Sequence, residues 1–174
     1  TAAAAAKTRS MKPLEAIKVD AVPRAVVIGG GPAGMKAARD LARQGIEAVL
    51  VEKTPFLGGS AARLDLVFPY GDQAGALLQE LADDILSDPS VKILTCAEVV
   101  GFHGYVGQFK LTVRRRPLSS QEELDQAARI QSFGRFVPFT GVAPGPPPET
   151  EEEMVVEAGA VILATGFRHY TPGR

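Results

Sequence analysis

The sequence predicts an α/β fold in which a parallel sheet is joined to a smaller antiparallel β-meander. Apolar strands and amphipathic helices alternate from residue 24 to residue 94 in the order strand, helix, strand, loop, helix, strand, which is typical of a parallel sheet. After residue 98 single apolar residues alternate with polar ones, as they do in antiparallel strands. The third observation is a glycine-rich turn after the first strand. The spacing of its glycines is typical of one class of parallel sheet.

The first strand and the first helix meet at this glycine-rich turn. Residues Ala25–Ile28 form an apolar run suited to a strand that is buried on both faces. Gly29, Gly31 and Gly34 follow in the G-x-G-x-x-G register. Pro32 stands where a helix would begin, and its missing N–H costs nothing there. In this order the first glycine permits a tight turn, the second lets a pyrophosphate approach the backbone, and the third lets the helix contact the strand closely.

A carboxylate at the end of the second strand completes the pattern. A helix is expected over residues 33–44, and Gly45 closes it as a left-handed cap. The apolar face of this helix consists of Gly34, Ala38, Leu41 and Ala42. The second strand, Ala48–Val51, stops at Glu52, which follows Gly34 by 18 residues. A carboxylate at this spacing accepts hydrogen bonds from the hydroxyls of an adenosine ribose. The pattern therefore predicts a Rossmann-like dinucleotide site. The alternative is a structural glycine turn beside an ordinary surface glutamate.

A loop, a second helix and a third strand are expected next. Residues 53–71 contain several prolines and glycines, which favour a loop. Residues 72–87 have the periodicity of an amphipathic helix. The apolar stripe of this helix consists of Leu77, Leu78, Leu81 and Ile85. The short apolar run Val91–Leu94 then supplies a third strand to the parallel sheet.

The remaining strands are expected in the second half of the chain. Within Glu98–Arg115 the alternation predicts two antiparallel strands that turn near Gly104–Gly107. A strand is expected at Met154–Val156. The apolar run Ala160–Thr165 predicts a final buried strand that ends at Gly166.

The chain is therefore expected to have three parts. The first is an N-terminal approach segment, residues 1–23. The Rossmann-like domain comprises residues 24–116 and 154–174. Between its two pieces lies a proline-rich and acidic insertion, residues 117–153, whose composition buries little surface. Within this insertion Ser120 begins a short helix that extends to about Ile130.

Composition and charge argue against several classes of function. The net charge of −1 over 174 residues gives no general attraction to nucleic acid. No apolar segment approaches the roughly 20 residues of a membrane span. The single cysteine, Cys96, cannot form an internal disulfide or hold an iron–sulfur cluster, and we expect it to be a small buried hydrophobe. No metal site is predicted. The stretch TAAAAAKTRS lacks the apolar region of a signal peptide, so a cytoplasmic location is expected.

Two further motifs extend the dinucleotide pattern. EKTPFLGG follows the second strand, and AVILATG forms the last strand and its turn. With the glycine turn, these motifs resemble the FAD module of thioredoxin-reductase-type flavoproteins over about residues 24–166. A narrower resemblance is to the A subunit of heterodisulfide reductase and its relatives. It rests on MKPLEAIKVDAVPRAVVIGGGPAGM, LGGSAARL, RFVPF and above all GYVGQFKLTVR.

The resemblance implies the FAD-binding part of an oxidoreductase that passes electrons between a two-electron donor and iron–sulfur partner proteins. The residues implied to bind FAD are Gly29, Gly31, Pro32, Ala33 and Gly34 at the pyrophosphate, Glu52 and Lys53 at the adenosine, Gly58, Gly59 and Ser60 close to the cofactor, Val99 at the adenine edge, and Ala164, Thr165 and Gly166 at the last strand. No catalytic acid, base or redox cysteine is indicated. Arg63 is more simply a surface residue than a neighbour of the flavin ring.

The sequence departs from this family in two places. Family members usually carry a cysteine-rich, cluster-binding insertion where this chain has residues 117–134, and no cysteine occurs there. We therefore expect no iron–sulfur cluster within this segment, and expect the partners to be iron–sulfur or other redox subunits of a complex. Family members also continue beyond the point equivalent to Arg174, so the chain is expected to be part of a longer polypeptide. Neither nucleic acid nor a membrane is expected as a partner.

The sequence leaves two other functions open. The first strand–helix–strand unit alone fits an NAD-binding dehydrogenase domain equally well, although LGG and the late Ala-Thr-Gly turn argue against it. The chain could also be a non-catalytic interaction module that retains a nucleotide fold and docks a partner through residues 117–150.

Overall fold

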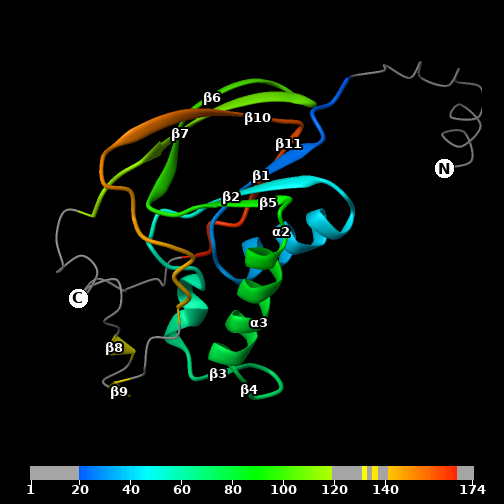
Figure 1. Cartoon of the computed structure of the whole chain (residues 1–174). Coiled ribbons are helices and arrows are strands. Elements are labelled where there is room, and N and C mark those ends of the chain that lie inside the picture. Colours follow the sequence, from blue (N-terminus) through cyan, green and yellow to red (C-terminus); the bar gives the residue numbers. More distant parts are fainter. Residues whose placement is uncertain (1–19, 119–130, 133–134, 137–140, 168–174) are drawn as a thin grey trace, which may run out of the picture.

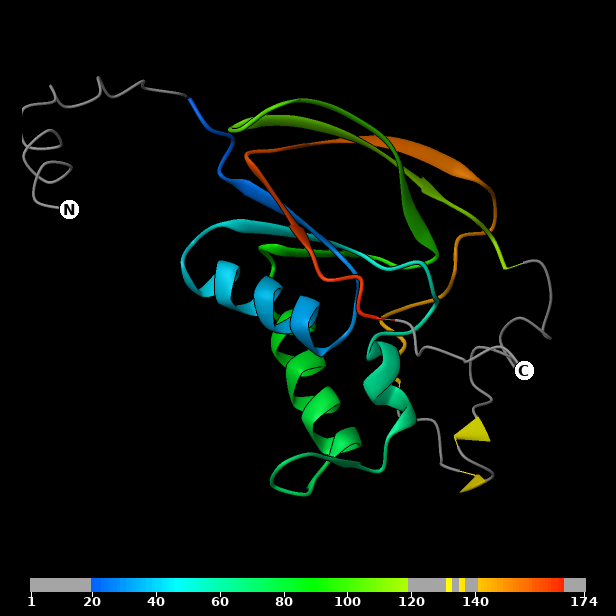
Figure 2. The same ribbon diagram turned by 180° about the vertical axis from the view of Figure 1, so that it is seen from behind.

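The computed structural model of the chain describes residues 20–118, 131–132, 135–136 and 141–167, which are arranged in three layers (Figure 1). Two helices cover one face of a four-stranded parallel sheet, and a three-stranded antiparallel sheet covers the other face (Figure 2). The expected α/β fold class with an antiparallel meander is confirmed.

The parallel sheet holds its first strand in the interior. The strand order is β11-β1-β2-β5, and all pairs are parallel. The strands are β1 (Arg24–Ile28), β2 (Glu47–Val51), β5 (Val91–Leu94) and β11 (Ala160–Leu163). Because β1 lies between two strands and two layers, Ala25, Val26 and Val27 are at most 2% exposed. This confirms the prediction of a strand that is buried on both faces.

The last strand differs from its prediction. A buried strand was expected over Ala160–Thr165, but β11 ends at Leu163, whose side chain is 74% exposed. Within the described residues β11 pairs only with β1 and forms an edge of the sheet. An apolar run shows that a strand can be buried but not on how many sides it is covered, so the sequence could not reveal this edge.

Helices α2 (Pro32–Arg43) and α3 (Ala74–Ser87) pack on one face of the parallel sheet. As expected, α2 begins at Pro32 and is followed by Gly45 with a φ of +75°. The buried core between the helices and the sheet includes Val27, Met35, Ala38, Leu50, Leu78, Leu81 and Ile85. This layer fixes the direction in which the N-terminus of α2 points relative to the end of β1.

The segment before α3 is more ordered than the expected loop. It contains a short 3₁₀ helix, η1 (Gly59–Arg63), and a hairpin of β3 (Leu66–Val67) and β4 (Asp72–Gln73). Because residues 72 and 73 pair with β3, α3 starts two residues later than predicted. Its buried stripe also differs, since Ala74 and Ala82 are buried while Leu77 is 36% exposed.

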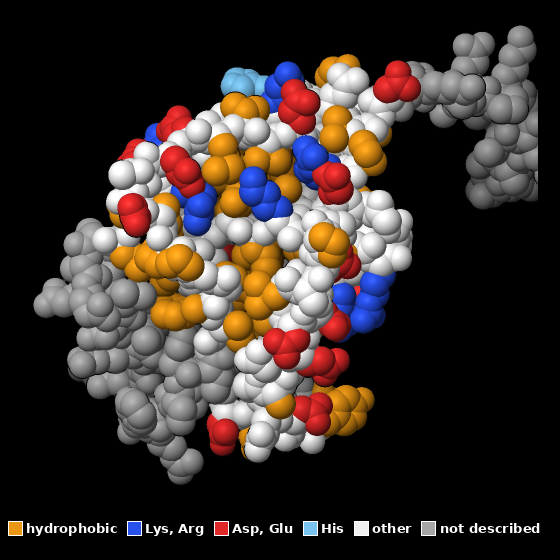
Figure 3. Space-filling model, in the orientation of Figure 1, with side chains coloured by type: hydrophobic (Ala, Val, Ile, Leu, Met, Phe, Trp, Pro, Cys, Tyr) orange, Lys and Arg blue, Asp and Glu red, His pale blue; other side chains and the backbone are white. Residues whose placement is uncertain are grey.

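Hydrophobic side chains protrude from the molecule near β3 and β4 (Figure 3). In the turn between these strands Phe68 and Tyr70 are 93% and 87% exposed. This turn is therefore an apolar part of the protein surface, distant from the carboxyl ends of the parallel strands.

The antiparallel sheet has the order β10-β7-β6, with β6 (Ala97–Tyr105), β7 (Gln108–Arg115) and β10 (Glu152–Ala158). The hairpin of β6 and β7 turns where it was expected, and a bulge lies between Val99 and Gly101. Strand β10 begins two residues before the predicted Met154. Glu152 and Glu153, assigned to the insertion by sequence, instead pair with Arg115 and Arg114 across the sheet.

Two predicted segments are described only in part. The N–H of Val22, in the approach segment, donates to the Gly107 carbonyl at 2.9 Å. Val142, in the insertion, forms an antiparallel bridge with Leu57. Two further short strands are β8 (Gln131–Ser132) and β9 (Arg135–Phe136). The helix expected to begin at Ser120 lies outside the described residues, as do residues 1–19.

A hydrogen-bonded turn between α3 and β5 gives a testable pKa. The N–H and the hydroxyl of Ser90 donate to one oxygen of Asp88 at 2.9 and 2.6 Å, and these bonds hold the pKa of Asp88 below its usual 3.8. We expect Ser90→Ala to raise the pKa of Asp88, as measured by a carboxyl ¹³C NMR titration. Because the folded-state pKa is lowered, the stabilisation is present above about pH 3.8 and is lost as the pH falls through the folded-state pKa.

Ser87→Ala is the matched control for this titration. The Ser87 hydroxyl donates to the carbonyl oxygens of Asp83 and Asp84 rather than to Asp88. An Asp88 pKa that stays the same in Ser90→Ala would contradict the assignment of the shift to Ser90.

Candidate functional site

The turn between β1 and α2 depends on glycine at two positions for packing. Gly29 has a φ of +114°, and a Cβ placed there would overlap the backbone carbonyl of Ala164. A Cβ on Gly34 would overlap the carbonyl oxygen of Gly29. Both glycines therefore serve close backbone contacts, as their positions in the motif predict. The Ala164 N–H also donates to the Ile28 carbonyl at 2.8 Å, which ties the turn after β11 to the end of β1.

Gly31 is different, because the space beside it is open. It is the N-cap of α2 with a φ of −75°, which any residue can adopt. A Cβ on Gly31 would meet only the Cα of Gly59, at 4.0 Å. The first N–H groups of a helix have no partners within the helix and carry a partial positive charge. Ala33 lies exposed in this first turn. The N-terminus of α2 can therefore receive an anionic group such as a pyrophosphate.

The Glu52 carboxylate lies against the glycine turn, as the sequence predicts. Glu52 is only 7% exposed, and its Oε2 accepts a hydrogen bond of 2.7 Å from the N–H of Gly30. Its Oε1 accepts hydrogen bonds from the N–H and the hydroxyl of Thr54, at 2.7 and 2.8 Å. A buried carboxylate needs such donors, because burying an unpartnered charge is costly. The negative charge of Glu52 is therefore held beside the positive end of α2.

Two residues of this arrangement were not predicted from the sequence. A Cβ on Gly30 would lie 2.8 Å from Leu57 Cδ2 and 3.0 Å from Glu52 Cβ, so Glu52 reaches the turn only because residue 30 is glycine. The unbroken triplet Gly29–Gly31 is the only sequence signal of this contact, since the motif leaves the second position free. Thr54 carries no sequence signal beyond being two residues after the carboxylate.

The glycine pair Gly58 and Gly59 packs against the glycine turn Gly29–Gly31. The N–H of Gly58 donates to the carbonyl of Gly30 at 2.8 Å, and Gly58 has a φ of +117°. A Cβ on Gly59 would lie 3.1 Å from the Cα of Gly31. The structure thus brings LGG to the glycine turn. Ser60 is exposed within η1.

A cleft of about 640 Å³ opens beside these residues, between the carboxyl ends of the parallel strands and the antiparallel sheet. Ligands of open α/β sheets bind outside the carboxyl ends of the strands. Five of the predicted residues line the cleft, namely Gly29, Glu52, Lys53, Val99 and Thr165. The other nine predicted residues are not among those that line it, namely Gly31, Pro32, Ala33, Gly34, Gly58, Gly59, Ser60, Ala164 and Gly166, and neither is Arg63.

The apolar wall of the cleft was not predicted. It includes Ile28, Val51, Phe102, Leu111, Val161 and Leu163. Phe102 is 53% exposed, and its ring centroid lies 5.1 Å from that of Phe109. The cleft therefore combines one buried carboxylate with a broad apolar surface, a combination that suits a nucleotide with an aromatic base.

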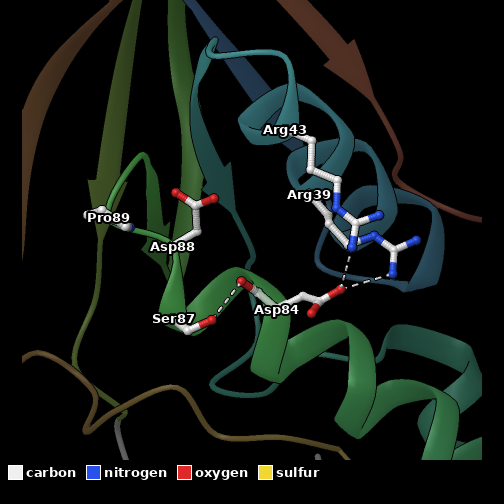
Figure 4. Close-up of a pocket in the computed structure, with 6 residues that line it drawn as sticks. All are labelled: Arg39, Arg43, Asp84, Ser87, Asp88 and Pro89. Atoms are coloured by element: carbon white, nitrogen blue, oxygen red, sulfur yellow. Dashed lines mark hydrogen bonds and ion pairs between the residues drawn. The ribbon is translucent and has the colours of Figure 1, made fainter.

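A second, smaller hollow of about 310 Å³ lies between the C-terminal parts of the two helices (Figure 4). Arg39 and Arg43 both donate to Oδ2 of Asp84, at 3.1 and 3.2 Å. Because the two guanidinium groups already share this carboxylate, and Asp88 also lines the hollow, its charges are largely balanced. We assign no ligand to it.

Neither a metal centre nor a membrane helix occurs among the described residues. No group of three or more His, Cys, Asp or Glu residues in this part of the chain is arranged to hold a metal ion. None of the helices in the described ranges is both long and apolar enough to cross a membrane.

Comparison with known proteins defines the class. The family model for FAD-dependent oxidoreductases matches residues 25–103. Among solved structures, the chain is similar to L-proline dehydrogenase from P. horikoshii, with a TM-score of 0.56, 20% identity, and coverage of 88% of this chain and 25% of that one. It is also similar to thioredoxin reductase from Lactococcus lactis, with a TM-score of 0.52, 20% identity, and coverage of 85% and 37%. The chain is therefore similar to FAD-dependent oxidoreductases over residues 25–103, and it shares its fold with these two solved structures.

Curated relatives make the assignment narrower. The iron-sulfur A subunit (form 2) of CoB–CoM heterodisulfide reductase from Methanopyrus kandleri is 45% identical over 120 residues, 69% of this chain and 18% of the relative. The A subunit of ferredoxin:CoB–CoM heterodisulfide reductase from Methanosarcina acetivorans is 34% identical over 214 residues, 94% of this chain and 27% of the relative. The chain is therefore related to the A subunit of heterodisulfide reductase, as its motifs predicted, and spans about a fifth to a quarter of the length of these relatives.

Proposed function

We propose that the cleft beside the glycine turn holds the ADP part of FAD. We further propose that the chain passes electrons between a two-electron donor and iron–sulfur or other redox subunits of a complex. The observation that carries the proposal is the position of Glu52. Its buried carboxylate is bonded to Gly30 in the turn that leads into the open N-terminus of α2. A nucleotide offers the two matching groups, since its ribose donates hydroxyls and its phosphates are anionic.

The residues present fit this cofactor, and each would have a distinct task. The N-terminus of α2 would bind the pyrophosphate in the open space beside Gly31. Glu52 would accept a ribose hydroxyl. The apolar residues of the wall, such as Val51 and Leu111, would exclude water from the adenine. When bound, FAD supplies the electron transfer, and the protein binds, orients and tunes it.

We also propose that this segment holds no iron–sulfur cluster of its own. Its sequence has one cysteine, Cys96, which is buried with 6% exposure. Clusters are held by several thiolates. Any cluster that exchanges electrons with this domain would lie in a partner or elsewhere in a longer polypeptide. The donor and acceptor would meet the cofactor rather than a redox cysteine of this segment.

Titration of the purified chain with FAD tests the proposal. We expect FAD to bind, ADP to compete with it, and saturation to raise the melting temperature. A ligand at about 100 times its Kd stabilises a protein by about 2.7 kcal/mol. Flavin fluorescence and thermal unfolding measure the two effects.

The same titration separates the other two functions. Binding of NADH without binding of FAD would indicate an NAD-binding dehydrogenase domain. Failure of both FAD and ADP to bind at millimolar concentration would contradict a nucleotide site and favour a non-catalytic interaction module.

A further inference from the structure

The carboxylate of Glu52 is held asymmetrically. A carboxylate offers about four acceptor positions, two on each oxygen. Thr54 donates twice to Oε1, once from its N–H at 2.7 Å and once from its hydroxyl at 2.8 Å. Gly30 donates once to Oε2, at 2.7 Å. These bonds leave one acceptor position, on Oε2, for a further donor.

The Thr54 hydroxyl is itself held in place. It lies 2.8 Å from Glu52 Oε1 and also 2.8 Å from the carbonyl oxygen of Phe56. Both neighbours are acceptors, so the single hydroxyl proton is donated to only one of them at a time, and the charged carboxylate is the stronger acceptor. The β-branched side chain of threonine also has few rotamers. The hydroxyl proton is therefore donated to Oε1 of Glu52.

We propose that Thr54 is a positioning residue that occupies Oε1 of Glu52 and so leaves Oε2 to recognise a single ribose hydroxyl. This inference rests on the proposed nucleotide site. With this arrangement Glu52 would distinguish one ribose hydroxyl from the other, which a carboxylate with two free oxygens would not do. If both oxygens of Glu52 were free, the 2′ and 3′ hydroxyls could both be accepted. With Oε1 occupied, only one of them can be.

The test uses the full chain and three probes: ADP, 2′-deoxy-ADP and 3′-deoxy-ADP. For the unchanged protein, calorimetry should show that one deoxy analogue binds about tenfold more weakly than ADP, which is the effect of one hydrogen bond to a charged group. The other analogue should bind within about twofold of ADP. In Thr54→Val, where Oε1 has an acceptor position free for the second hydroxyl, we expect the ratio between the two analogues to fall below about threefold.

Thr54→Ser is the matched control, because it keeps the hydroxyl and should keep the discrimination. The ratio between the analogues is measured within one variant, so partial loss of folded protein does not change it. An analogue ratio in Thr54→Val equal to that of the unchanged protein would overturn the inference and leave the nucleotide site intact. Failure of the unchanged protein to bind either ADP or FAD would overturn the proposed function and this inference with it.

Discussion

Glu52→Gln is expected to weaken FAD binding about 10- to 100-fold while the chain still folds. Three donors face the carboxylate, one from Gly30 and two from Thr54. A glutamine amide has one acceptor oxygen and one NH₂ group. The oxygen is best placed at Thr54, which leaves the NH₂ group facing Gly30 and the ribose. A hydrogen bond to a charged group contributes about 1.5–3 kcal/mol, and each 1.4 kcal/mol changes affinity about tenfold.

Flavin fluorescence titration measures this loss, and urea unfolding measures stability. We expect a stability loss of about 1–3 kcal/mol, because the Gly30 N–H is left without its acceptor. Glu47→Gln is the matched control. Glu47 begins strand β2, which ends at Val51 directly before Glu52, and its carboxylate pairs with Arg24 at the protein surface, where the Glu47 side chain is 55% exposed. The Glu47→Gln variant should bind FAD with an affinity within about twofold of that of the unchanged protein. Equal affinity in Glu52→Gln and the unchanged chain would show that the nucleotide lies elsewhere.

The parts of the site that sequence alone predicted are those in which one residue type serves one backbone requirement. Gly29 and Gly34 are needed because a Cβ at either position would overlap backbone. Glu52 is found by counting from the turn, since strand and helix lengths in a strand–helix–strand unit bring the end of the second strand beside the first turn. These features follow from local geometry, which short sequence patterns record well.

The parts that sequence could not predict depend on how separate layers meet. Val100 is an extra residue in β6, since Val99 pairs with Val113 and Gly101 pairs with Thr112. This bulge reverses the alternation of the strand, and Phe102 consequently lies on the same face as Val99 and lines the cleft. Counting alternate residues from Val99 would place Phe102 on the other face.

The hydrogen bonds of Glu52 were hidden for a similar reason. The contact between Glu52 and Gly30 joins the ends of two strands, and Leu57 packs beside it from the following loop. The motif states which residues approach a ligand but not which residues hold the carboxylate in its place. Such supporting contacts follow from packing between segments and therefore require the three-dimensional arrangement.

Gly31→Ala is expected to weaken nucleotide binding more than tenfold without loss of stability, whereas Gly34→Ala is expected to destabilise the chain strongly. The backbone of Gly31 has a φ of −75°, and a new methyl group there would meet only Gly59, at 4.0 Å. The stability should change by less than about 1 kcal/mol, the scale of an alanine in place of glycine at an N-cap. The methyl group would occupy the space proposed for the pyrophosphate, so FAD affinity should fall more than tenfold.

Gly34→Ala places the same methyl group one helical turn further along, where it overlaps the carbonyl oxygen of Gly29. Helix α2 would then have to move away from β1, at a cost of about 3 kcal/mol or more. Urea unfolding and FAD titration of both variants give a paired test. If Gly31→Ala leaves the FAD affinity unchanged, the pyrophosphate does not bind at the N-terminus of α2. Full stability of Gly34→Ala would contradict the close packing of α2 on β1.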